Sequence, residues 1–503
     1  MELLRSLADS ARTQPDRCAL VCDDQELTYQ ELDERMRQVA RALVGLGCRP
    51  GDRVAYHGHP SVHHFEFLLG ARKAGAVPVP LNWRLAPPEI LAILADAEAT
   101  LLLAEPGLWE PVTRDQEKID DLTVVPIDGP GWARLLASSA DVPDELDGPG
   151  DVVLQIYTSG TTGRPKGVMT GADAIDAYLA TLGGVARMSR SSTTLSSLPL
   201  FHIGGTGWVL AGLHQGATAV MLTSAAPDLL LVTVERRAVT TLIAVPTILR
   251  MTLDSPTLHE HDLSSLETLY YGAGPITVTE LRAALSAFDC AFVQGFGMTE
   301  CGIATALTPE DHLRRPDLLG SCGRPVADTE VRLVDADTAR DIPDGVVGEV
   351  WIRSPITMAG YWRQPEATAA ALTRDGWLRT GDAALRNEEG YLFLQDRLKD
   401  VIITGGENVY SAEVENALAA HPGVAECAVI GVPSARWSET VKAVVVRAVG
   451  SDVSETDLIA FCRERLARYK APTSVAFVEA LPRNPSGKVL KFVLRDMQAA
   501  NDA

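Results

Sequence analysis

The chain has 503 residues and a formal net charge of −21 at pH 7, which argues against nucleic acid as a partner because binding it requires a basic surface. Hydrophobic residues make up 46% and charged residues 22%, a composition typical of a soluble globular protein, and the length predicts roughly three units of about 150 residues. No window approaches the roughly 18 apolar residues of a membrane span. The N-terminus lacks a basic segment followed by an apolar core, so we expect a cytoplasmic protein without a transmembrane segment.

Cysteine and histidine positions bear on redox state and metal binding. The eight cysteines, at 18, 22, 48, 290, 301, 322, 427 and 462, form no C-x-x-C pair, which indicates reduced thiols rather than a disulfide framework or a zinc site. His57, His59, His63 and His64 are close in sequence. We find no carboxylate or cysteine at ligand spacing beside them, so ordinary core or solvated histidines are favoured over a metal site.

The N-terminal elements follow from capping and periodicity. Thr28-Tyr-Gln-Glu31 is a capping box, and apolar residues at helical spacing extend the predicted helix to Gly47. A strand is predicted at 54–56 and a helix at 62–74, and the prolines of 76–81 suit an edge strand. Residues 106–150 are rich in Asp, Pro and Gly and are predicted to form a looping surface excursion.

The most informative segment is Tyr157-Thr-Ser-Gly-Thr-Thr-Gly-Arg-Pro-Lys-Gly167, which follows a predicted buried strand at 151–156. Its glycines allow backbone N–H groups to approach an anion, its hydroxyls add donors, and Lys166 offers a point charge to phosphate. A nucleotide-binding P-loop is excluded, because Pro165 precedes the lysine and Gly167 follows it. The pattern therefore predicts a polyphosphate cradle, with an ordinary surface turn as the alternative.

The rest of the chain alternates between strands and helices. Apolar strands are predicted near 218–223, 241–245, 267–271 and 291–294, and their alternation with helical stretches indicates parallel α/β sheets. Segments 348–353 and 391–394 indicate a small barrel or an antiparallel piece. Strands at 426–432, 441–449 and 474–478, with two helices, suffice for a small α+β domain. We therefore predict an N-terminal domain of residues 1–396 and a C-terminal domain of residues 397–503.

Two segments suit a ligand pocket on their residue types alone. Pro199–Gly205 combines an aromatic residue and a histidine with two glycines, although on their own Phe201 and His202 are interpreted as core. Tyr271–Pro275 places glycines at the end of a strand, where open α/β sheets bind ligands, with a tight turn as the alternative.

The segment 157–167, together with 294–300, 377–382, 396–410 and 481–488, resembles the motifs of the adenylate-forming superfamily, which includes acyl-CoA synthetases, luciferases and peptide-synthetase adenylation domains. The resemblance covers essentially the whole chain, and is strongest to bacterial fatty-acyl-CoA synthetases and 4-coumarate-CoA ligases. It implies an α/β fold, in which a large N-terminal domain of parallel α/β sheets with a small barrel-like part precedes a small, mobile α+β C-terminal domain.

The resemblance also implies an ATP site. Asp382 would bind the ribose with Arg397 nearby, since a carboxylate can accept from two hydroxyls, and Glu300 with Thr158 would hold Mg²⁺, a hard cation that prefers carboxylate oxygen. Phe296, where the superfamily usually has tyrosine, would pack on adenine, and Thr299 would meet the phosphates. The other ATP-binding candidates are Thr158, Ser159, Gly160, Thr161, Thr162, Gly163, Lys166, Gly272, Ala273, Gly274, Gln294, Gly295, Gly297 and Met298.

The same resemblance assigns the acid, CoA and hinge. The acyl-pocket candidates are Phe201, His202, Trp208, Thr247, Gly274, Met298 and Ile303. His202 stands where peptide-synthetase domains typically carry an aspartate for the substrate amine, so amino acids are disfavoured. Gly405, Gly406 and Trp437 would border the CoA tunnel, Lys399 would be the hinge, and the loop of Lys488 would bring that lysine to the acyl carboxylate and the α-phosphate.

The resemblance implies an AMP-forming acyl-CoA synthetase with Mg²⁺, ATP and CoA as cofactor and co-substrates and an apolar carboxylic acid as substrate. Lys488, Glu300, Thr158 and Lys166 would be its catalytic residues. The alternatives are an enzyme that loads a carrier protein, an aryl (cinnamate-like) CoA ligase and a catalytically silent relative, the last disfavoured by the intact motifs. The sequence leaves open which acid is used and whether the chain forms a homodimer.

Overall fold

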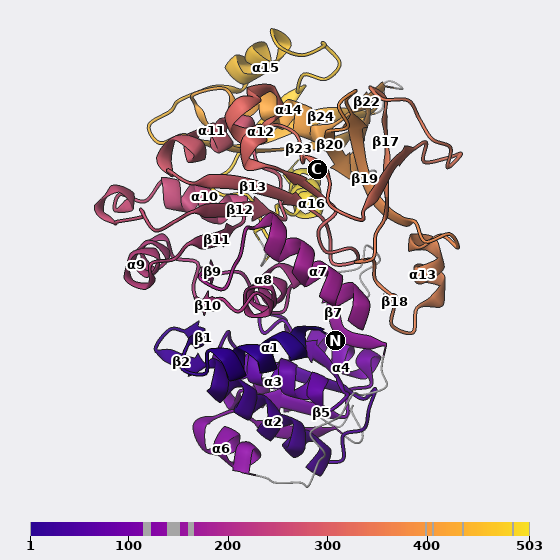
Figure 1. The fold of residues 1–503 in the computed structure, drawn as a ribbon. Helices are drawn as coiled ribbons and strands as arrows, with labels where there is room; N and C mark the ends of the chain where they lie inside the picture. Colours follow the sequence, from indigo (N-terminus) through magenta and orange to yellow (C-terminus); the bar gives the residue numbers. More distant parts are fainter. Residues whose placement is uncertain are drawn as a thin grey trace.

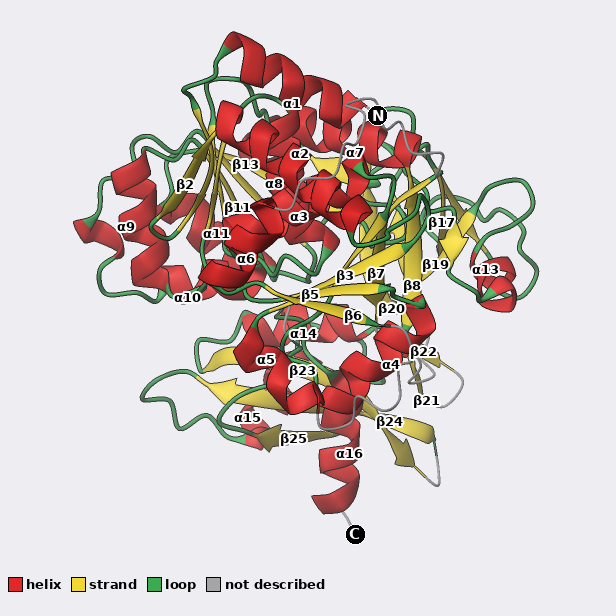
Figure 2. Cartoon of the chain, turned by 90° about the horizontal axis from the view of Figure 1, so that it is seen from below, coloured by secondary structure: helices red, strands yellow, loops and turns green. Residues whose placement is uncertain are grey.

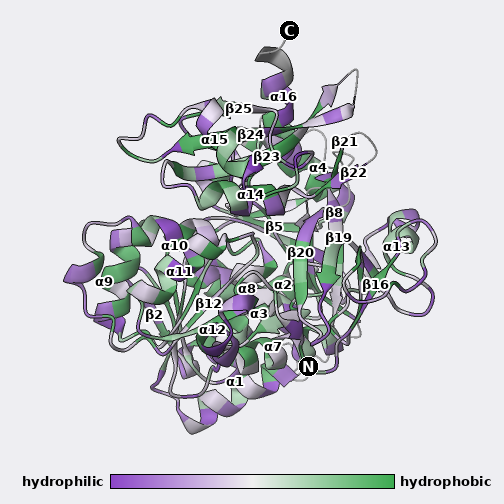
Figure 3. Cartoon of the chain, turned by 90° about the horizontal axis from the view of Figure 1, so that it is seen from above, coloured by the Kyte–Doolittle hydropathy of each residue, from purple (hydrophilic) through white to green (hydrophobic). Residues whose placement is uncertain are grey.

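The computed structural model describes residues 2–113, 122–137, 151–158, 165–397, 400–404, 407–434, 437–484 and 487–501. Figure 1 shows the N-terminal residues in indigo at one end of the molecule and the C-terminal residues in orange and yellow at the other. Strands of the described residues form five sheets, and Figure 3 shows hydrophobic residues concentrated along them. Within this part of the chain, no helix combines the length and the apolar character needed to cross a membrane.

The N-terminal sheet is parallel, with the strand order β4-β3-β5-β6. Its strands are β3 (Arg53–His57), β4 (Val77–Pro80), β5 (Leu101–Ala104) and β6 (Thr123–Pro126), and its helices are α2 (Tyr29–Gly45), α3 (Val62–Lys73), α4 (Pro87–Ala97), α5 (Pro106–Thr113) and α6 (Gly129–Ala137). The capping box at Thr28 and Glu31 is confirmed, and β4 lies at the predicted edge. The predicted looping excursion of 106–150 is wrong for 106–113, where α5 buries Trp109 and Val112. It is also wrong for 122–137, because β6 pairs with β5 and Trp132 and Leu135 of α6 are buried.

The largest described sheet has the order β15-β14-β13-β12-β11-β9-β10-β1-β2. Its six central strands are parallel, and β2, β14 and β15 are added antiparallel at the edges. The strands are β1 (Cys18–Cys22), β2 (Gln25–Thr28), β9 (Thr193–Ser196), β10 (Thr218–Met221), β11 (Thr241–Ala244), β12 (Thr268–Gly272), β13 (Ala291–Phe296), β14 (Thr305–Leu307) and β15 (Arg324–Pro325). The associated helices are α1 (Glu2–Thr13), α7 (Ala172–Val185), α8 (Ile203–His214), α9 (Pro227–Arg237), α10 (Pro246–Leu253), α11 (Val278–Ala287) and α12 (Pro309–Arg314). The predicted parallel α/β alternation is confirmed.

Two smaller antiparallel sheets complete the N-terminal part. One has the order β18-β8-β7 and consists of β7 (Val152–Thr158), β8 (Lys166–Gly171) and β18 (Gly360–Tyr361). The other has the order β16-β17-β19-β20 and consists of β16 (Glu330–Val334), β17 (Val347–Arg353), β19 (Leu378–Arg386) and β20 (Leu392–Arg397), with α13 (Pro365–Ala371) beside it. Of the two alternatives for 348–353 and 391–394, the antiparallel piece is therefore confirmed.

The C-terminal elements gather at one end of the molecule (Figure 2 and Figure 3). They form one sheet of β21 (Ile402–Thr404), β22 (Glu407–Val409), β23 (Val424–Ser434), β24 (Ser438–Arg447) and β25 (Ser474–Phe477). Its described helices are α14 (Ser411–Ala419), α15 (Glu455–Arg463) and α16 (Lys491–Asn501), one more than the two predicted. Residues such as Val414, Val429 and Leu458 form a buried core of their own here. This supports a separate C-terminal unit, and the boundary at 396/397 stays a prediction.

Candidate active site

The predicted site segments follow neighbouring parallel strands of the largest sheet. Phe201 and His202 come shortly after β9, Thr247 after β11, Gly274 after β12 and Glu300 after β13. These four strands lie side by side in the order β13-β12-β11-β9. Because the carboxyl ends of parallel strands meet at one edge, and open α/β sheets bind ligands there, segments as far apart in sequence as Phe201 and Glu300 converge on one place.

The predicted phosphate loop joins the two strands of a hairpin. β7 pairs with β8, and the last matched pair is Thr158 with Lys166. The chain therefore leaves β7 and enters β8 at paired positions. Ser159, Gly160, Thr161, Thr162 and Gly163 lie outside the described residues, so their predicted contacts with phosphate stay predictions.

Lys166 and Glu300 both contact Tyr361, a residue that the sequence analysis did not name. The Lys166 Nζ lies 4.7 Å from the centroid of the Tyr361 ring, and the Tyr361 hydroxyl donates a 2.8 Å hydrogen bond to Oε1 of Glu300. Glu300 is buried, with 7% of its surface exposed. The predicted phosphate lysine and the predicted metal carboxylate therefore contact the two parts of one side chain.

The donor set around Glu300 fits Mg²⁺. No group of three or more His, Cys, Asp or Glu side chains suited to a metal occurs among the described residues, so an all-protein cage is absent from them. Mg²⁺ is usually held by one or two carboxylates together with substrate phosphates, and Glu300 supplies such a carboxylate next to Lys166. Two of the four histidines near the N-terminus pair with carboxylates, since His59 Nδ1 lies 2.6 Å from Glu105 and His63 Nδ1 lies 2.8 Å from Glu66. The expectation that no carboxylate accompanies these histidines is therefore wrong for His59 and His63, whereas His57 and His64 are buried.

The predicted ribose residues are brought together by strand pairing. Asp382 on β19 is the register partner of Arg397 on β20, although the Arg397 side chain lies outside the description. Asp382 is 7% exposed, and its backbone N–H donates to the Thr380 hydroxyl at 3.0 Å. Gly381, with φ +69°, supplies the backbone conformation that L side chains avoid.

The predicted catalytic loop of the C-terminal part contacts the N-terminal part directly. The Thr247 hydroxyl donates to the Gly487 carbonyl at 3.1 Å, and Arg483 donates to that carbonyl at 2.7 Å and to the Thr247 hydroxyl at 3.0 Å. The Lys488 N–H donates to Asn484 Oδ1 at 2.8 Å, which closes the turn. Lys488, itself exposed, therefore sits next to a residue at the carboxyl end of β11.

Ionic contacts extend this junction. Glu426 of β23 accepts from Arg250 of α10 at 2.7 Å and from Arg483 at 2.6 Å, and Arg250 also lies 3.4 Å from Glu280. We call Arg250, Glu426 and Arg483 the junction cluster. All three side chains are only 18–23% exposed, so their charges are partly shielded from solvent.

Three predicted site residues carry buried polar atoms that lack a protein partner within the described part of the chain. These atoms are His202 Nε2, Trp208 Nε1 and Gln294 Oε1. Buried polar groups without a partner are uncommon in folded proteins and call for an explanation. Residues outside the predicted site carry such atoms too, for example His57 and Trp132, so the missing partners are not specific to the site.

The acyl-pocket candidates lie in different surroundings. Phe201 borders a small cavity with His64 and Trp83. The pKa of His202 is lowered to about 4, because burial disfavours the imidazolium and Arg84 adds a nearby positive charge, so this ring is neutral at neutral pH. The acyl roles of Phe201 and His202 stay predictions.

The remaining acyl candidates are more deeply packed. Trp208 is fully buried against Tyr270, with ring centroids 5.4 Å apart, Ile303 is also buried, and Met298 is partly buried beside another core cluster. Gly274 is more open, since an added Cβ would meet nothing nearer than Pro246 at 3.8 Å. Their acyl roles stay predictions, as does that of Thr247.

Two glycines of the predicted adenine segment are explained by packing. A Cβ at Gly295 would lie 1.7 Å from the Tyr270 hydroxyl oxygen, and one at Gly297 would lie 1.8 Å from the Gly302 carbonyl oxygen. Both positions therefore require glycine whether or not ATP approaches them. The ATP roles of Gly272, Ala273, Gly295, Gly297 and their neighbours, including Phe296 and Thr299, stay predictions.

Of the predicted CoA and hinge residues, the structure describes only Trp437. Lys399, Gly405 and Gly406 are not among the described residues. Trp437 is 46% exposed, which is unusual for tryptophan and leaves its ring accessible to a ligand or to another part of the chain.

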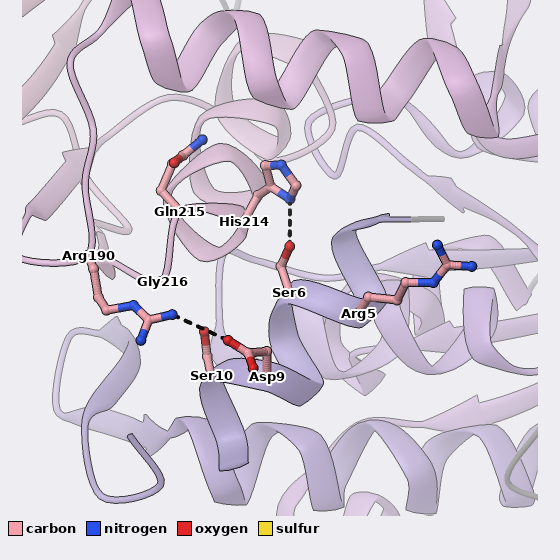
Figure 4. A pocket seen from close by; sticks show the side chains of 8 residues that line it. All are labelled: Arg5, Ser6, Asp9, Ser10, Arg190, His214, Gln215 and Gly216. Carbon is pink, nitrogen blue, oxygen red and sulfur yellow. Dashed lines mark hydrogen bonds and ion pairs between the residues drawn. The ribbon is translucent and has the colours of Figure 1, made fainter. Parts of the chain in front are cut away.

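A separate surface hollow lies between α1 and the end of α8 (Figure 4). Its polar groups contact one another: Arg190 lies 3.3 Å from Asp9, and Ser6 Oγ lies 3.2 Å from His214 Nδ1. None of the predicted site residues lines it. This hollow is therefore distinct from the predicted active site.

Comparison with known proteins identifies the family. The AMP-binding enzyme family matches residues 7–362, and the AMP-binding enzyme C-terminal domain matches residues 413–488. The chain is 41% identical to a feruloyl-CoA synthase from an Amycolatopsis species, over 96% of each chain. It is 38% identical to the fatty acid–[acyl-carrier-protein] ligase ScoC of Streptomyces coeruleorubidus, over 98% of this chain and 96% of ScoC. The ATP-bound structure of MatB from Rhodopseudomonas palustris superposes with a TM-score of 0.90 at 31% identity, covering 98% of both chains.

The chain therefore belongs to the AMP-binding enzyme family, in the acyl-CoA synthetase branch of the adenylate-forming superfamily. It is an AMP-forming acid–thiol ligase.

Proposed function

We propose that this ligase activates an apolar carboxylic acid as its acyl-adenylate and transfers the acyl group to CoA. The residues would have the roles that their sequence motifs imply. The observation that carries the proposal is the contact between the turn of Gly487 and Lys488 and Thr247. That contact holds the turn that precedes the exposed Lys488 beside Thr247, which follows β11, and it supports a role for this lysine where the acid and ATP segments converge. An arrangement with Lys488 at the reacting groups is the one that adenylation requires.

In adenylation, a carboxylate oxygen of the acid attacks the α-phosphorus of ATP, and pyrophosphate leaves. Lys166 and the 158–163 segment hold the phosphates, and Asp382 binds the ribose. Mg²⁺, when bound by Glu300 and the phosphates, neutralises phosphate charge. Lys488 stabilises the negative charge that develops on the transferring group, and a fixed positive charge in a site shielded from water is effective at this.

In thioester formation, the CoA sulfur attacks the acyl carbonyl carbon and AMP leaves. The Gly487 turn occupies the strand edge in the present arrangement, so we propose that the C-terminal part rotates about Lys399 before this step. The rotation would present Gly405, Gly406 and the exposed Trp437 to CoA. It must also break the Arg250–Glu426 contact, the ion pair of the junction cluster that joins the two parts.

An aryl acid is the favoured alternative to an alkyl one. The chain is 41% identical to a feruloyl-CoA synthase over 96% of each chain, and this similarity supports an aryl acid.

A carrier protein is the alternative to CoA, and the similarity to ScoC motivates it. A pyrophosphate-release assay over alkyl, benzoic, cinnamic and amino acids, followed by offering CoA or a phosphopantetheinyl carrier protein, tests both choices. CoA-dependent release of AMP with an apolar acid supports the proposal. Release with the carrier protein alone, or with amino acids alone, would contradict it.

A further inference from the structure

Tyr361 makes one contact with each half of the proposed ATP site. Its hydroxyl donates to the Glu300 carboxylate at 2.8 Å, and its ring lies 4.7 Å from the Lys166 ammonium. The side chain is 7% exposed. Lys166, Glu300 and Tyr361 are widely separated in sequence, so this arrangement exists only in the folded chain.

Backbone contacts on both sides fix the position of Tyr361. In β18, Tyr361 pairs with Val168 of β8, and the Trp362 N–H donates to the Gly167 carbonyl at 2.8 Å. On the other side, the Met358 N–H donates to the backbone carbonyl of Glu300 at 2.8 Å. The segment 358–362 therefore ties the strand that carries Lys166 to the loop that carries Glu300.

Side-chain contacts add to this attachment. The Gln364 amide donates to the Pro165 carbonyl at 3.1 Å, directly before Lys166. The Tyr361 N–H donates to the Thr368 hydroxyl at 2.9 Å. With its backbone held at several points, the Tyr361 ring has little freedom to follow a moving carboxylate, so it sets the carboxylate's position instead.

We infer that Tyr361 is a positioning residue for nucleotide binding, whose hydroxyl orients Glu300 toward Mg²⁺ and whose ring orients Lys166 toward the phosphates. The inference rests on the proposed function, which assigns Glu300 to the metal and Lys166 to the phosphates. Hydrogen bonds to a metal-binding carboxylate fix its orientation and tune its metal affinity. A cation over an aromatic face is attracted by the ring quadrupole.

The two contacts belong to different parts of the side chain, so substitutions can separate them. Tyr361→Phe removes the hydroxyl and keeps the ring beside Lys166, whereas Tyr361→Leu removes both. Binding of the non-hydrolysable analogue α,β-methylene-ATP, measured by calorimetry in EDTA and then at increasing Mg²⁺, reports on both contacts without turnover. The metal-free affinity reports on Lys166, and the Mg²⁺ concentration for half-maximal enhancement reports on Glu300.

For Tyr361→Phe we expect the half-maximal Mg²⁺ concentration to rise about 10-fold or more, the effect typical of losing a partner of a metal ligand. The metal-free affinity should stay within about twofold of wild type, because a phenyl ring retains most of the cation–π attraction. For Tyr361→Leu we expect the same Mg²⁺ shift and, in addition, a metal-free affinity about threefold weaker.

Tyr391 offers a matched control. Its hydroxyl donates to Asp311 at 2.7 Å, its ring lies 4.8 Å from the Arg324 guanidinium, and it is 5% exposed. It therefore makes the same two kinds of contact as Tyr361, but with residues outside the proposed site. Tyr391→Phe should leave both affinities unchanged, and a Mg²⁺ shift equal to that of Tyr361→Phe would reduce the effect to general destabilisation and overturn the inference.

Glu300→Gln separates failure of the inference from failure of the proposed function. If this variant shifts the Mg²⁺ dependence and Tyr361→Phe does not, the positioning role is wrong and the metal assignment stands. If Glu300→Gln leaves the Mg²⁺ dependence at wild type, the metal assignment itself is wrong. Equal loss of metal-free and Mg²⁺-dependent affinity in Tyr361→Phe would also overturn the inference, because the hydroxyl would then act on nucleotide binding as a whole.

Discussion

Weakening the junction cluster should shift the balance between the two half-reactions. Glu426 holds Arg250 at 2.7 Å and Arg483 at 2.6 Å, and the Arg250 contact joins the N-terminal part to the C-terminal part. Glu426→Gln keeps the size of the side chain and removes its charge. The present arrangement, with the Lys488 loop beside Thr247, should then become less favourable relative to the rotated one.

The size of the effect follows from the exposure of the cluster. Solvent-exposed ion pairs contribute roughly 0.2–1 kcal/mol, and hydrogen bonds to charged groups roughly 1.5–3 kcal/mol. With side chains 18–21% exposed for the Arg250 pair, we expect a value between these ranges, about 1 kcal/mol. At about 1.4 kcal/mol per factor of ten, the equilibrium between the two arrangements should shift about fivefold.

Two half-reactions measure this equilibrium. On the proposed mechanism, pyrophosphate exchange requires the arrangement with Lys488 at the site, and conversion of supplied acyl-AMP to acyl-CoA requires the rotated one. In Glu426→Gln, the rate of acyl-CoA formation divided by the rate of pyrophosphate exchange should therefore rise about fivefold, which corresponds to about 1 kcal/mol. Higher salt should reduce the difference from wild type, because it screens partly exposed charges.

Glu413→Gln is the matched control. Glu413 accepts from Lys470 at 2.7 Å with comparable exposure, 34% and 22%, but both residues belong to the C-terminal part. Its ratio of rates should match wild type. The reasoning is refuted if Glu426→Gln leaves the ratio unchanged, or if Glu413→Gln changes it equally.

Two further predictions concern the ribose contact and acid stability. If Asp382 binds the ribose as proposed, Asp382→Ala removes a charged acceptor for two hydroxyls at roughly 1.5–3 kcal/mol each, and kcat/KM for ATP should fall at least about tenfold. Unchanged ATP kinetics would make Asp382 only a structural residue. Burial lowers the pKa of His64 from 6.5 to about 3, so the unfolded chain binds the proton more tightly, and the stability from this neutral histidine is present above pH 6.5 and lost as the pH falls toward 3. Between pH 7 and pH 4.5, the free energy of unfolding of His64→Phe, measured in urea, should therefore fall by about 3 kcal/mol less than that of wild type. An equal fall in both proteins would contradict the lowered pKa of His64.

The sequence predicted the elements that depend on local pattern. The capping box at Thr28, the parallel strands and the antiparallel segments are all present. The elements within 106–113 and 122–137 were missed because Pro and Gly dominate the local signal. Helix α5 is defined by the packing of Trp109 and Val112 in a core cluster, and the short strand β6 by pairing with β5. Proline at an edge strand costs little, so composition alone could not exclude a strand there.

The sequence predicted the motifs of the candidate site but not the contacts between side chains that lie far apart in the chain. Glu300, Asp382 and Lys488 stood out by sequence, whereas Tyr361 did not, because its role depends on a hydrogen bond to a residue 61 positions away. The junction cluster was missed for the same reason, since Arg250 and Glu426 meet only when the two parts of the chain come together. Contacts between residues far apart in the chain leave no periodicity or fixed spacing in the sequence, so they cannot be inferred from it.

The most direct test of the two-arrangement account uses Lys488, which must be at the reacting groups in one half-reaction and away from them in the other. Lys488→Ala should abolish pyrophosphate exchange, because the developing charge loses its fixed cation. The same variant should convert chemically prepared acyl-AMP to acyl-CoA at close to the wild-type rate. If Lys488→Ala slows both half-reactions equally, the lysine is structural, and the account of alternating arrangements is wrong.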